Sequence, residues 1–495
     1  MLILFNPSST TPGKAPLPMS LLALGSVMEG RRDYKIVDAN LLHNPANPIP
    51  ELLEIIEREK ATALGMTVMP GPQLNQAVPL TKQVKAKFPD LPIIWGGYFP
   101  TQHSEIILKA DYVDYTVRSQ GELTLIELLD VLEYGGDLSA VNGISYRDGD
   151  KIVNTAPRAL TPIEKFPMFP YHQVDVPRYM QNNYVGTRTL DHNSSFGCPF
   201  ACNFCAIVSM TNRGWLPESA QRMADTLKHL QNTYGVNAIQ FHDMDFFISE
   251  KRVVEFCDRI KDFGMTWWAL GRIDELSRFA DSTWQLMKKS GLKMIFCGAE
   301  TGSDEMLARM NKGGQASVQL TLDLAVKMKS YGIVPEYSFV LGNPPEPEQD
   351  IEITFNFIRK LKQLNPATEL ILYTYTPVPM DAGGGDLYEN AKAAGFHFPE
   401  TLEDWTTGAW RDFALRREPD TPWLDTSIYR KVRNFERVIN AYYPTTTDMK
   451  LTGMRKTMLR AVGGWRYHLK FYDAPLELRA MQRLFHYQRP ETTGF

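Results

Sequence analysis

Three cysteines stand close together near the middle of the chain, at Cys198, Cys202 and Cys205. Their CxxxCxxC spacing would fit one face of a helix, so a buried cysteine stripe is the structural alternative. Gly197 and Pro199 favour an irregular loop after a strand instead, because both residue types interrupt regular structure. Thiols that converge in such a loop are typical ligands of zinc or of an iron–sulfur cluster.

The two kinds of metal centre make different demands on the chain. A closed structural zinc site needs a fourth ligand, and His192 is the only nearby candidate. A [4Fe-4S] cluster held by three cysteines leaves one iron without a protein ligand, and a small molecule can bind there. The other two cysteines, Cys257 and Cys297, stand alone. We expect them in the core, because free cysteine is commonly buried.

The cysteine motif resembles that of the radical S-adenosylmethionine (SAM) superfamily. In that superfamily the open iron chelates the amino and carboxylate groups of SAM, and electron transfer cleaves SAM to a 5′-deoxyadenosyl radical. Further matches lie in segments 241–246, 271–274, 297–302 and 338–344. The resemblance implies SAM contacts at Phe204, Asp243, Arg272, Glu300, Ser338 and Leu341.

The resemblance also gives some of these residues a role. Phe204 is expected near the adenine, and Glu300 near the ribose hydroxyls. Asp243 or Asp245 could accept hydrogen bonds from the SAM ammonium, with a solvated acidic turn as the alternative. Arg272 could pair with the SAM carboxylate, with a surface salt bridge as the alternative.

Residues 1–150 alternate short apolar runs with amphipathic stretches. The expected strands are 2–5, 34–37, 63–67, 93–95 and 112–117, and the expected helices are 19–28, 50–60, 73–88 and 123–132. This βα alternation predicts a doubly wound parallel sheet, whose ligands bind beyond the carboxyl ends of the strands. No GxGxxG or GxxxxGK[ST] motif follows a strand, so common nucleotide-binding domains are disfavoured.

This region resembles the cobalamin-binding domain of one radical SAM subgroup, which includes the anaerobic Mg-protoporphyrin ester cyclase and many carbon methyltransferases. A domain that keeps the sheet and has lost the cofactor is the alternative. No DxHxxG motif marks a lower cobalt ligand, and we expect His43 and His103 in surface loops. The resemblance implies cobalamin contacts at Asn6, Asp38, Thr67, Gly96, Gly97, Tyr98 and Glu122.

The sequence predicts an α/β protein with a Rossmann-like cobalamin-binding domain, a partial (βα)6 radical SAM barrel and a helical C-terminal region. The expected divisions are residues 1–150, a proline-rich linker at 151–190, the barrel at 191–400 and a substrate-selecting region at 401–495. The barrel strands are expected to end near Gly197, Asp243, Arg272, Ala299, Leu341 and Thr376.

Composition narrows the classes of partner. Lys and Arg number 53 against 57 Asp and Glu, which gives a net charge of −4 and disfavours a general nucleic-acid binder. The sequence shows no signal peptide and no apolar run of about 18 residues, so we expect a cytoplasmic protein. The arginines and aromatic residues after 425 suit either a shallow membrane contact or solvated helix faces.

The leading hypothesis is a cobalamin-dependent radical SAM enzyme that methylates an unactivated carbon of a small-molecule substrate. The alternative within the enzyme class is oxidative cyclisation or ring rearrangement of a tetrapyrrole, lipid or natural product. A noncatalytic cobalamin or redox sensor is the alternative from another class. The enzyme interpretation implies an external electron donor such as flavodoxin or ferredoxin, and no catalytic acid or base is assigned.

Overall fold

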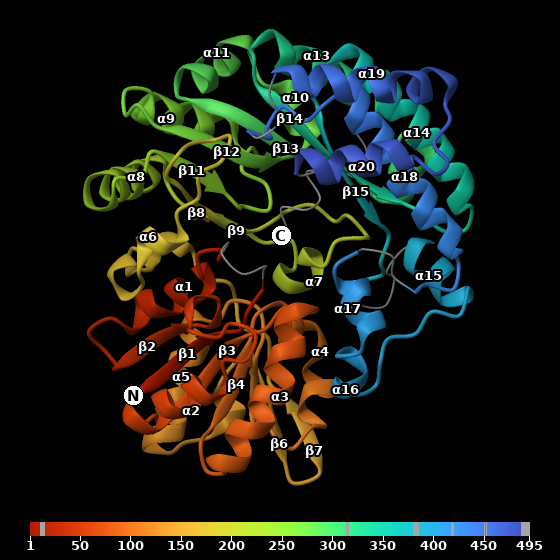
Figure 1. The fold of residues 1–495 in the computed structure, drawn as a ribbon. Helices are drawn as coiled ribbons and strands as arrows, with labels where there is room; N and C mark the ends of the chain where they lie inside the picture. The colour runs from red at the N-terminus through yellow and green to blue at the C-terminus, as the bar shows by residue number, and fades with distance from the viewer. Residues whose placement is uncertain are drawn as a thin grey trace.

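Two sheets dominate the structure, a mixed one below a fully parallel one in Figure 1, and helices of the C-terminal part run beside both. The computed structural model describes residues 1–9, 15–312, 316–379, 386–416, 420–449, 451 and 453–486. Within these ranges, no helix combines the length and the apolar character needed to span a bilayer.

The first sheet has the strand order β2-β1-β3-β4-β5-β6-β7, in which β1 to β5 are parallel and β6 and β7 form an antiparallel hairpin. Its strands are β1 Leu2–Asn6, β2 Tyr34–Asp38, β3 Ala63–Thr67, β4 Ile93–Gly96, β5 Tyr115–Val117, β6 Ile144–Asp148 and β7 Lys151–Asn154. Its helices are α1 Met19–Met28, α2 Ile49–Arg58, α3 Pro72–Lys87, α4 Tyr98–Leu108 and α5 Glu122–Tyr134. The order reverses at β1, so the ligand crevice of such a fold lies between the ends of β1 and β3.

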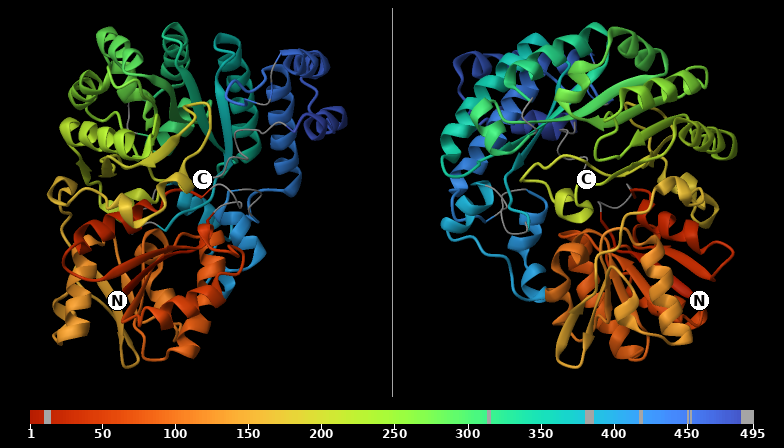
Figure 2. Two further views of the ribbon diagram at one scale, coloured as in Figure 1. Left: turned by 60° about the vertical axis from the view of Figure 1, so that its left-hand side comes forward. Right: turned by 180° about the vertical axis from the view of Figure 1, so that it is seen from behind.

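The second sheet has the order β15-β14-β13-β12-β11-β8, and all its strands are parallel. Its strands are β8 Thr189–His192, β11 Ala238–Phe241, β12 Thr266–Gly271, β13 Leu292–Glu300, β14 Val334–Leu341 and β15 Glu369–Thr374. The main crossover helices are α8 Ala220–Tyr234, α9 Glu250–Ile260, α11 Asp281–Lys289, α13 Val318–Ser330 and α14 Pro347–Leu364. This parallel sheet with helices on one side is the predicted partial barrel (Figure 2).

One barrel strand differs from the prediction. The segment that ends at Gly197 is β9, Ser195–Gly197, and it pairs with β10, Trp215–Pro217, in a separate antiparallel hairpin. The first strand of the parallel sheet is β8 instead. Gly197 has φ +84°, and the backbone of Gly214 lies against it, so the chain turns there as only glycine readily can.

Residues alternate between the two faces of the second sheet. One face packs against the helices in the main core, which includes Ile239, Trp267, Cys297 and Tyr337. Cys257 and Cys297 are both buried in this core, as predicted. The opposite face, called the inner face below, includes Gln240, Trp268, Leu270, Phe296 and Glu336. Several of its side chains are partly exposed, whereas their neighbours along each strand are buried.

The C-terminal helices are α15 Asp386–Ala393, α16 Leu402–Trp405, α17 Gly408–Ala414, α18 Thr426–Tyr442, α19 Gly453–Leu469 and α20 Leu476–Phe485. The short helices α16 and α17 return to the first sheet, beside α3 and α4 (Figure 1). There the Trp405 ring lies 5.1 Å from that of Phe99 and 4.7 Å from that of His103.

This return corrects one expectation for the histidines. His103 is buried in α4 rather than in a surface loop, because Phe398 and Trp405 cover it. Burial lowers the pKa of His103 to about 4. His43 lies at the surface as expected.

Candidate active site at the cysteine hairpin

The three clustered cysteines follow β9 in the loop of the β9–β10 hairpin. All three thiols are free, and Cys202 and Cys205 both act electrostatically on Cys198. Burial raises the pKa of Cys198 to about 11 and also raises that of Cys205. Backbone N–H groups of Phe200 and Ile207 act in the opposite direction, since each donates to one of these sulfurs. The loop therefore gathers sulfur donors and directs amide groups toward them, a donor set that fits an iron–sulfur cluster.

A buried guanidinium lies against this loop. Arg272 directly follows β12, and its Nη1 donates to Cys202 Sγ at 3.3 Å. Its Nε and Nη2 donate to both carboxylate oxygens of Asp274, at 3.1 and 2.9 Å. The guanidinium carbon also lies 3.8 Å from the ring centroid of Phe200. Arg272 thus places positive charge on a cysteine of the loop, and its carboxylate partner within the chain is Asp274.

A second buried cation lies beside the same loop. Lys312 Nζ pairs with Glu300 Oε1 and lies 5.7 Å from the ring centroid of Phe204. Although burial acts against the charge, Glu300 and Cys202 raise the pKa of Lys312, so the lysine stays protonated. Glu300 has φ +63° and lies at an irregularity in the β13–β14 pairing. Sequence reasoning missed Lys312, because a single lysine after a short helix carries no motif of its own.

The two aspartates after β11 have different surroundings. Asp243 accepts hydrogen bonds from the Ser194 N–H at 3.1 Å and its Oγ at 3.0 Å, and also from Ser195 Oγ. Asp245 is also buried, but its Oδ2 has no hydrogen-bond partner among the described residues. Burial raises the pKa of Asp245 to about 7. Of the two expected acceptors, Asp245 therefore keeps a carboxylate oxygen available, whereas Asp243 anchors the hairpin.

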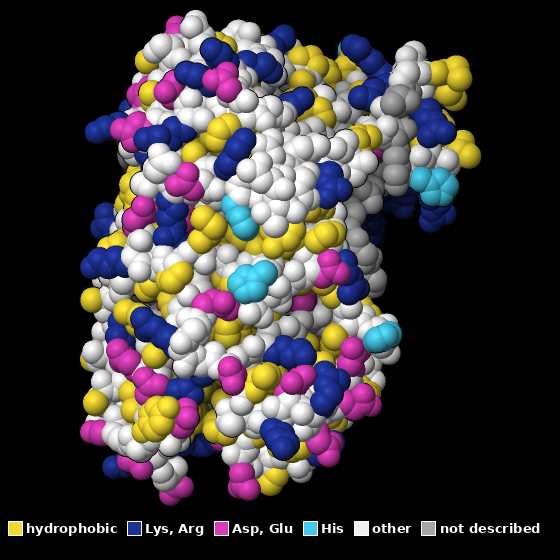
Figure 3. Space-filling view, turned by 90° about the vertical axis from the view of Figure 1, so that its left-hand side faces the viewer, with side chains coloured by type: hydrophobic (Ala, Val, Ile, Leu, Met, Phe, Trp, Pro, Cys, Tyr) yellow, Lys and Arg dark blue, Asp and Glu magenta, His cyan; other side chains and the backbone are white. Residues whose placement is uncertain are grey.

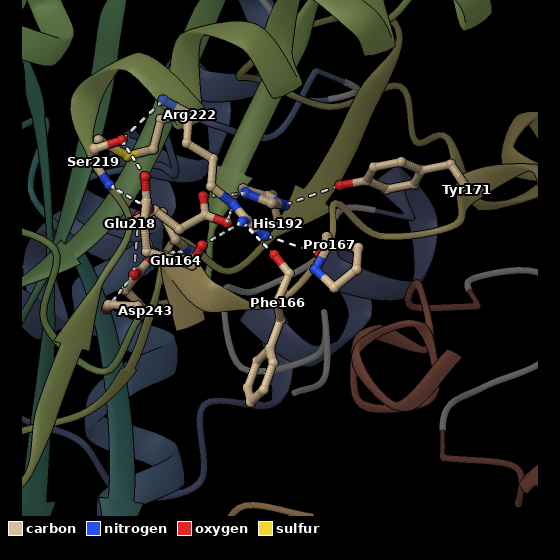
Figure 4. Close-up of polar contacts among 12 residues, drawn as sticks. Glu164, Phe166, Pro167, Tyr171, His192, Glu218, Ser219, Arg222 and Asp243 are labelled. Carbon is tan, nitrogen blue, oxygen red and sulfur yellow. Dashed lines mark hydrogen bonds and ion pairs between the residues drawn. The ribbon is translucent and has the colours of Figure 1, made fainter. Parts of the chain in front are cut away.

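His192 belongs to a polar network beneath the hairpin (Figure 4). Its Nδ1 lies 3.1 Å from the Tyr171 hydroxyl, and its Nε2 lies 3.5 Å from Glu218 Oε2. Glu218 in turn accepts from Arg222 Nε at 2.8 Å. Both ring nitrogens of His192 are engaged, so the fourth ligand of a closed zinc site is not available from this residue. Within the described ranges, no three histidine, cysteine or acidic side chains are placed to share one metal ion.

The remaining expected SAM residues lie on different faces of β14. Ser338 is buried on the inner face, next to Gly298 of β13. Leu341 lies in the main core, and its carbonyl accepts from the Tyr375 N–H at 2.9 Å. Of Ser338 and Leu341, only Ser338 points to the inner face, where Arg272 also lies.

At the first sheet, four of the predicted cobalamin residues meet at the ends of β3 and β4. Gly97 has φ +96°, and a Cβ there would lie 3.1 Å from Thr67 Oγ1, so glycine keeps the two loops close together. Gly96 and Tyr98 flank this turn. At the neighbouring loop Met69 is 49% exposed, and beyond β1 the buried Ser9 Oγ lacks a partner among the described residues. An exposed thioether, an unpaired hydroxyl and a glycine turn fit a bulky ligand at this edge.

The other three predicted cobalamin residues are engaged within the protein. Asn6 Nδ2 donates to Asp38 Oδ1 at 3.0 Å, and the Tyr179 hydroxyl donates to Asp38 Oδ2 at 2.9 Å. Burial raises the pKa of Glu122, and its carboxylate accepts from the N–H groups of Gly121 and Glu122 at the start of α5. These side chains stabilise the ends of β1 and β2 and the start of α5. Their polar groups bond within the protein rather than toward a ligand at the edge of the sheet.

Helix α4 connects the edge of the first sheet with the cysteine hairpin. It packs against α7, Ile207–Thr211, which directly follows the cysteine loop (Figure 1). Gln102 Nε2 donates to Ser209 Oγ at 2.9 Å and to the Ala206 carbonyl at 3.3 Å. Burial raises the pKa of Tyr98 to about 12, and Arg416 and Cys205 are the charges that act on it. The cobalamin-type edge and the cysteine loop therefore face each other across one junction.

Comparisons with known proteins identify two domains in the chain. A B12 binding domain model matches residues 11–129, and a Radical SAM superfamily model matches residues 192–358. An uncharacterized methyltransferase of Pyrococcus horikoshii is 28% identical over 348 residues, which cover 70% of this chain and 73% of that protein. The anaerobic magnesium-protoporphyrin IX monomethyl ester cyclase of Synechocystis is 27% identical over 329 residues, 64% of each chain.

A solved structure extends the likeness of fold to nearly the whole chain. The radical SAM methyltransferase TsrM from Kitasatospora setae, with cobalamin and a [4Fe-4S] cluster bound, superposes with a TM-score of 0.66 at 15% identity. The match covers 98% of both chains. With a B12 binding domain and a radical SAM domain in one α/β chain, this protein belongs to the cobalamin-dependent radical SAM enzymes, which use a [4Fe-4S] cluster, SAM and cobalamin.

Proposed function

We propose that this enzyme methylates an unactivated carbon of a small-molecule substrate. The observation that carries the proposal is the α4–α7 junction, because Tyr98 and Gln102 bring the cobalamin edge against the cysteine loop. When bound, the cluster and SAM supply a radical that removes a hydrogen atom, and cobalamin supplies a methyl group. The methyltransferase relatives support the choice of reaction.

In this proposal Cys198, Cys202 and Cys205 hold the cluster, and Arg272 donates to one of their sulfurs. Asp245 takes the place of Asp243 as acceptor for the SAM ammonium, because only Asp245 has an oxygen without a partner in the described part of the chain.

Further SAM contacts are assigned to side chains around the cysteine loop. Phe204 offers an aromatic face to the adenine, and Glu300 offers a carboxylate to the ribose. Ser338 lies on the same inner face. Leu341 contributes packing beneath the site, since its side chain lies in the core.

Thr67, Gly96, Gly97 and Tyr98 form the proposed cobalamin contacts, while Asn6, Asp38 and Glu122 support them from below. We retain the divisions at residues 1–150, 151–190, 191–400 and 401–495 as a proposal. Helices α16 and α17 then belong to the last division, and they complete the surface of the first division.

A second candidate reaction is oxidative cyclisation or ring rearrangement, and the cyclase relative favours it. A noncatalytic sensor would retain the cofactors without cleaving SAM. One experiment separates these functions: anaerobically reconstituted protein receives reductant and SAM that carries a deuterated methyl group. Formation of 5′-deoxyadenosine excludes the sensor. A product that is heavier by the labelled methyl group supports methylation, whereas a product with fewer hydrogens and no label supports cyclisation.

We also propose a location and partners. All five cysteines are free, which supports a reducing compartment such as the cytoplasm. An external donor such as flavodoxin or ferredoxin would reduce the cluster. The C-terminal helices support a peripheral membrane contact, since eight of the 15 exposed large hydrophobic side chains of the described ranges lie between Met449 and Leu484. Figure 3 shows hydrophobic and basic side chains together on this lobe, at the upper right.

A further inference from the structure

The inner face of the second sheet carries side chains that the cofactors do not account for. Its rows follow from the register of the parallel strands, because paired residues point to the same side. The lower row is Asp191, Gln240, Trp268, Met294 and Val334. The middle row is Leu270, Phe296, Glu336 and Glu369, with His242 at its open end. The upper row is Arg272, Gly298, Ser338 and Ile371.

The middle row lies next to the proposed SAM site. Arg272 of the upper row contacts Cys202, so the upper row borders the cysteine loop. Two residues along a strand span about 6.6 Å, so the middle row lies about that far below the upper row. A substrate that lies beneath SAM therefore meets the middle row, where Phe296 and Glu336 are partly exposed.

Aromatic rings line this row: Trp268 is buried beneath it in an apolar cluster, and Phe296 and His242 are partly exposed. The rings of His242 and Trp268 lie 5.3 Å apart, and those of Trp268 and Phe296 lie 6.3 Å apart at a steep angle. His242 Nε2 is also 3.1 Å from Asp191 Oδ1, so the imidazole is held in place by a carboxylate. Such a corner of rings fits a flat apolar body rather than a flexible polar one.

Among the described residues, Glu336 has no cation at hydrogen-bond distance. Glu336 Oε2 accepts from the Trp268 indole N–H at 3.2 Å, and the other charged groups that act on Glu336 are Glu369 and His242. Glu369 is buried; Lys362 and Lys456 act on its charge, and its Oε1 accepts from the N–H groups of Thr446 and Thr447. Burial and Glu369 raise the pKa of Glu336 to about 8, while the Trp268 N–H and His242 act in the opposite direction.

We propose that the middle row is the substrate site and that it takes an aromatic amine, whose ring packs against Phe296 and His242 and whose ammonium pairs with Glu336. This inference rests on the proposed function, since it places the substrate beneath SAM. An ammonium supplies Glu336 with a cation in direct contact, whereas the carboxylate of an anionic ligand is repelled once Glu336 ionises.

The test uses two probes that differ only in the charged group, tryptamine and indole-3-propionate. Their affinities are measured by saturation-transfer NMR on holoenzyme that carries cluster and hydroxocobalamin, with SAM present and no reductant. We expect tryptamine to bind at least about tenfold more tightly than indole-3-propionate. The variant Glu336→Gln should weaken tryptamine by about tenfold or more and should leave indole-3-propionate no weaker. The control Glu305→Gln, at an exposed carboxylate of α12 (Asp304–Arg309), should change neither affinity.

A pH series on the unaltered enzyme tests the same pairing if Glu336→Gln fails to fold. Tryptamine stays protonated between pH 6.5 and 8.5, as lysine-like amines do. Its affinity should rise with pH because Glu336 ionises, and the loss of charge on His242, whose partner is Asp191, acts in the same direction. Equal affinities for the two probes, or a flat pH series, would overturn the proposal. Iron content, cobalt content and 5′-deoxyadenosine formation are measured separately. A failure of the proposed function can therefore be distinguished from a failure of the substrate-site proposal.

Discussion

The contact between Arg272 and Cys202 predicts a measurable effect on the redox potential of the cluster. In the variant Arg272→Gln the donor to Cys202 Sγ, at 3.3 Å, loses its charge. A full charge at this distance interacts by about 5 kcal/mol at an effective dielectric constant of about 20. An added electron is shared over the cluster, so about a quarter to a half of this energy stabilises the reduced state. For a one-electron couple this corresponds to about 50 to 110 mV.

We therefore expect Arg272→Gln to lower the midpoint potential of the cluster by about 50 to 110 mV. The buried Asp274 loses its partner in this variant, and its negative charge moves the potential in the same direction. The assay is an EPR-monitored redox titration of reconstituted protein without SAM. Arg278→Gln is the control, because this arginine of α10 (Ile273–Arg278) is exposed. An intact cluster with a potential shift below about 20 mV would refute the reasoning.

Four further changes test other parts of the structure. Cys202→Ala should lose iron and keep cobalt, as measured by metal analysis after reconstitution. Gly97→Val should weaken cobalamin binding by about tenfold or more while iron is retained, because φ +96° and the nearby Thr67 hydroxyl exclude a branched side chain. Lys312→Met should lower the free energy of unfolding by about 3 kcal/mol, because it leaves Glu300 buried and unpaired; adding Glu300→Gln should restore most of this stability in denaturant titrations. Leu469→Glu, at a side chain that is 72% exposed, should reduce sedimentation with anionic vesicles without changing stability. Equal sedimentation of the two proteins would contradict the membrane contact.

The sequence predicted those parts of the fold that depend on local pattern. Strands β1, β3 and β4 of the first sheet are buried on both faces, as their nearly continuous apolar runs indicate, and the cysteine loop follows a strand, where Gly197 and Pro199 favour it. Helix α4 was not predicted, because its first turn is Tyr-Phe-Pro and its backbone is irregular at His103. The burial of His103 depends on Trp405, which is about 300 residues away, and no local pattern carries such a contact.

The same distinction applies to the candidate site. The family resemblance predicted which types of residue form the site. It did not predict which of their polar atoms are free to bind a ligand. Asp243 and Asp245 are two residues apart and identical in type, and only the contacts with Ser194 and Ser195 distinguish them. Lys312 was not predicted, because its importance comes from Glu300 on another element.

The return of α16 and α17 to the first sheet has a consequence for protein engineering. Asn75 Nδ2 donates to the Thr406 carbonyl at 3.0 Å, and Lys82 pairs with Glu403. A segment from the C-terminal half of the chain therefore covers part of the N-terminal domain. A chimera that exchanges only residues 1–150 with a relative would place a foreign α3 against native α16, and the native Phe398 and Trp405 would lose their partners Phe99 and His103. The exchangeable unit is therefore discontinuous in sequence, and it includes the segment from Phe398 to Ala414.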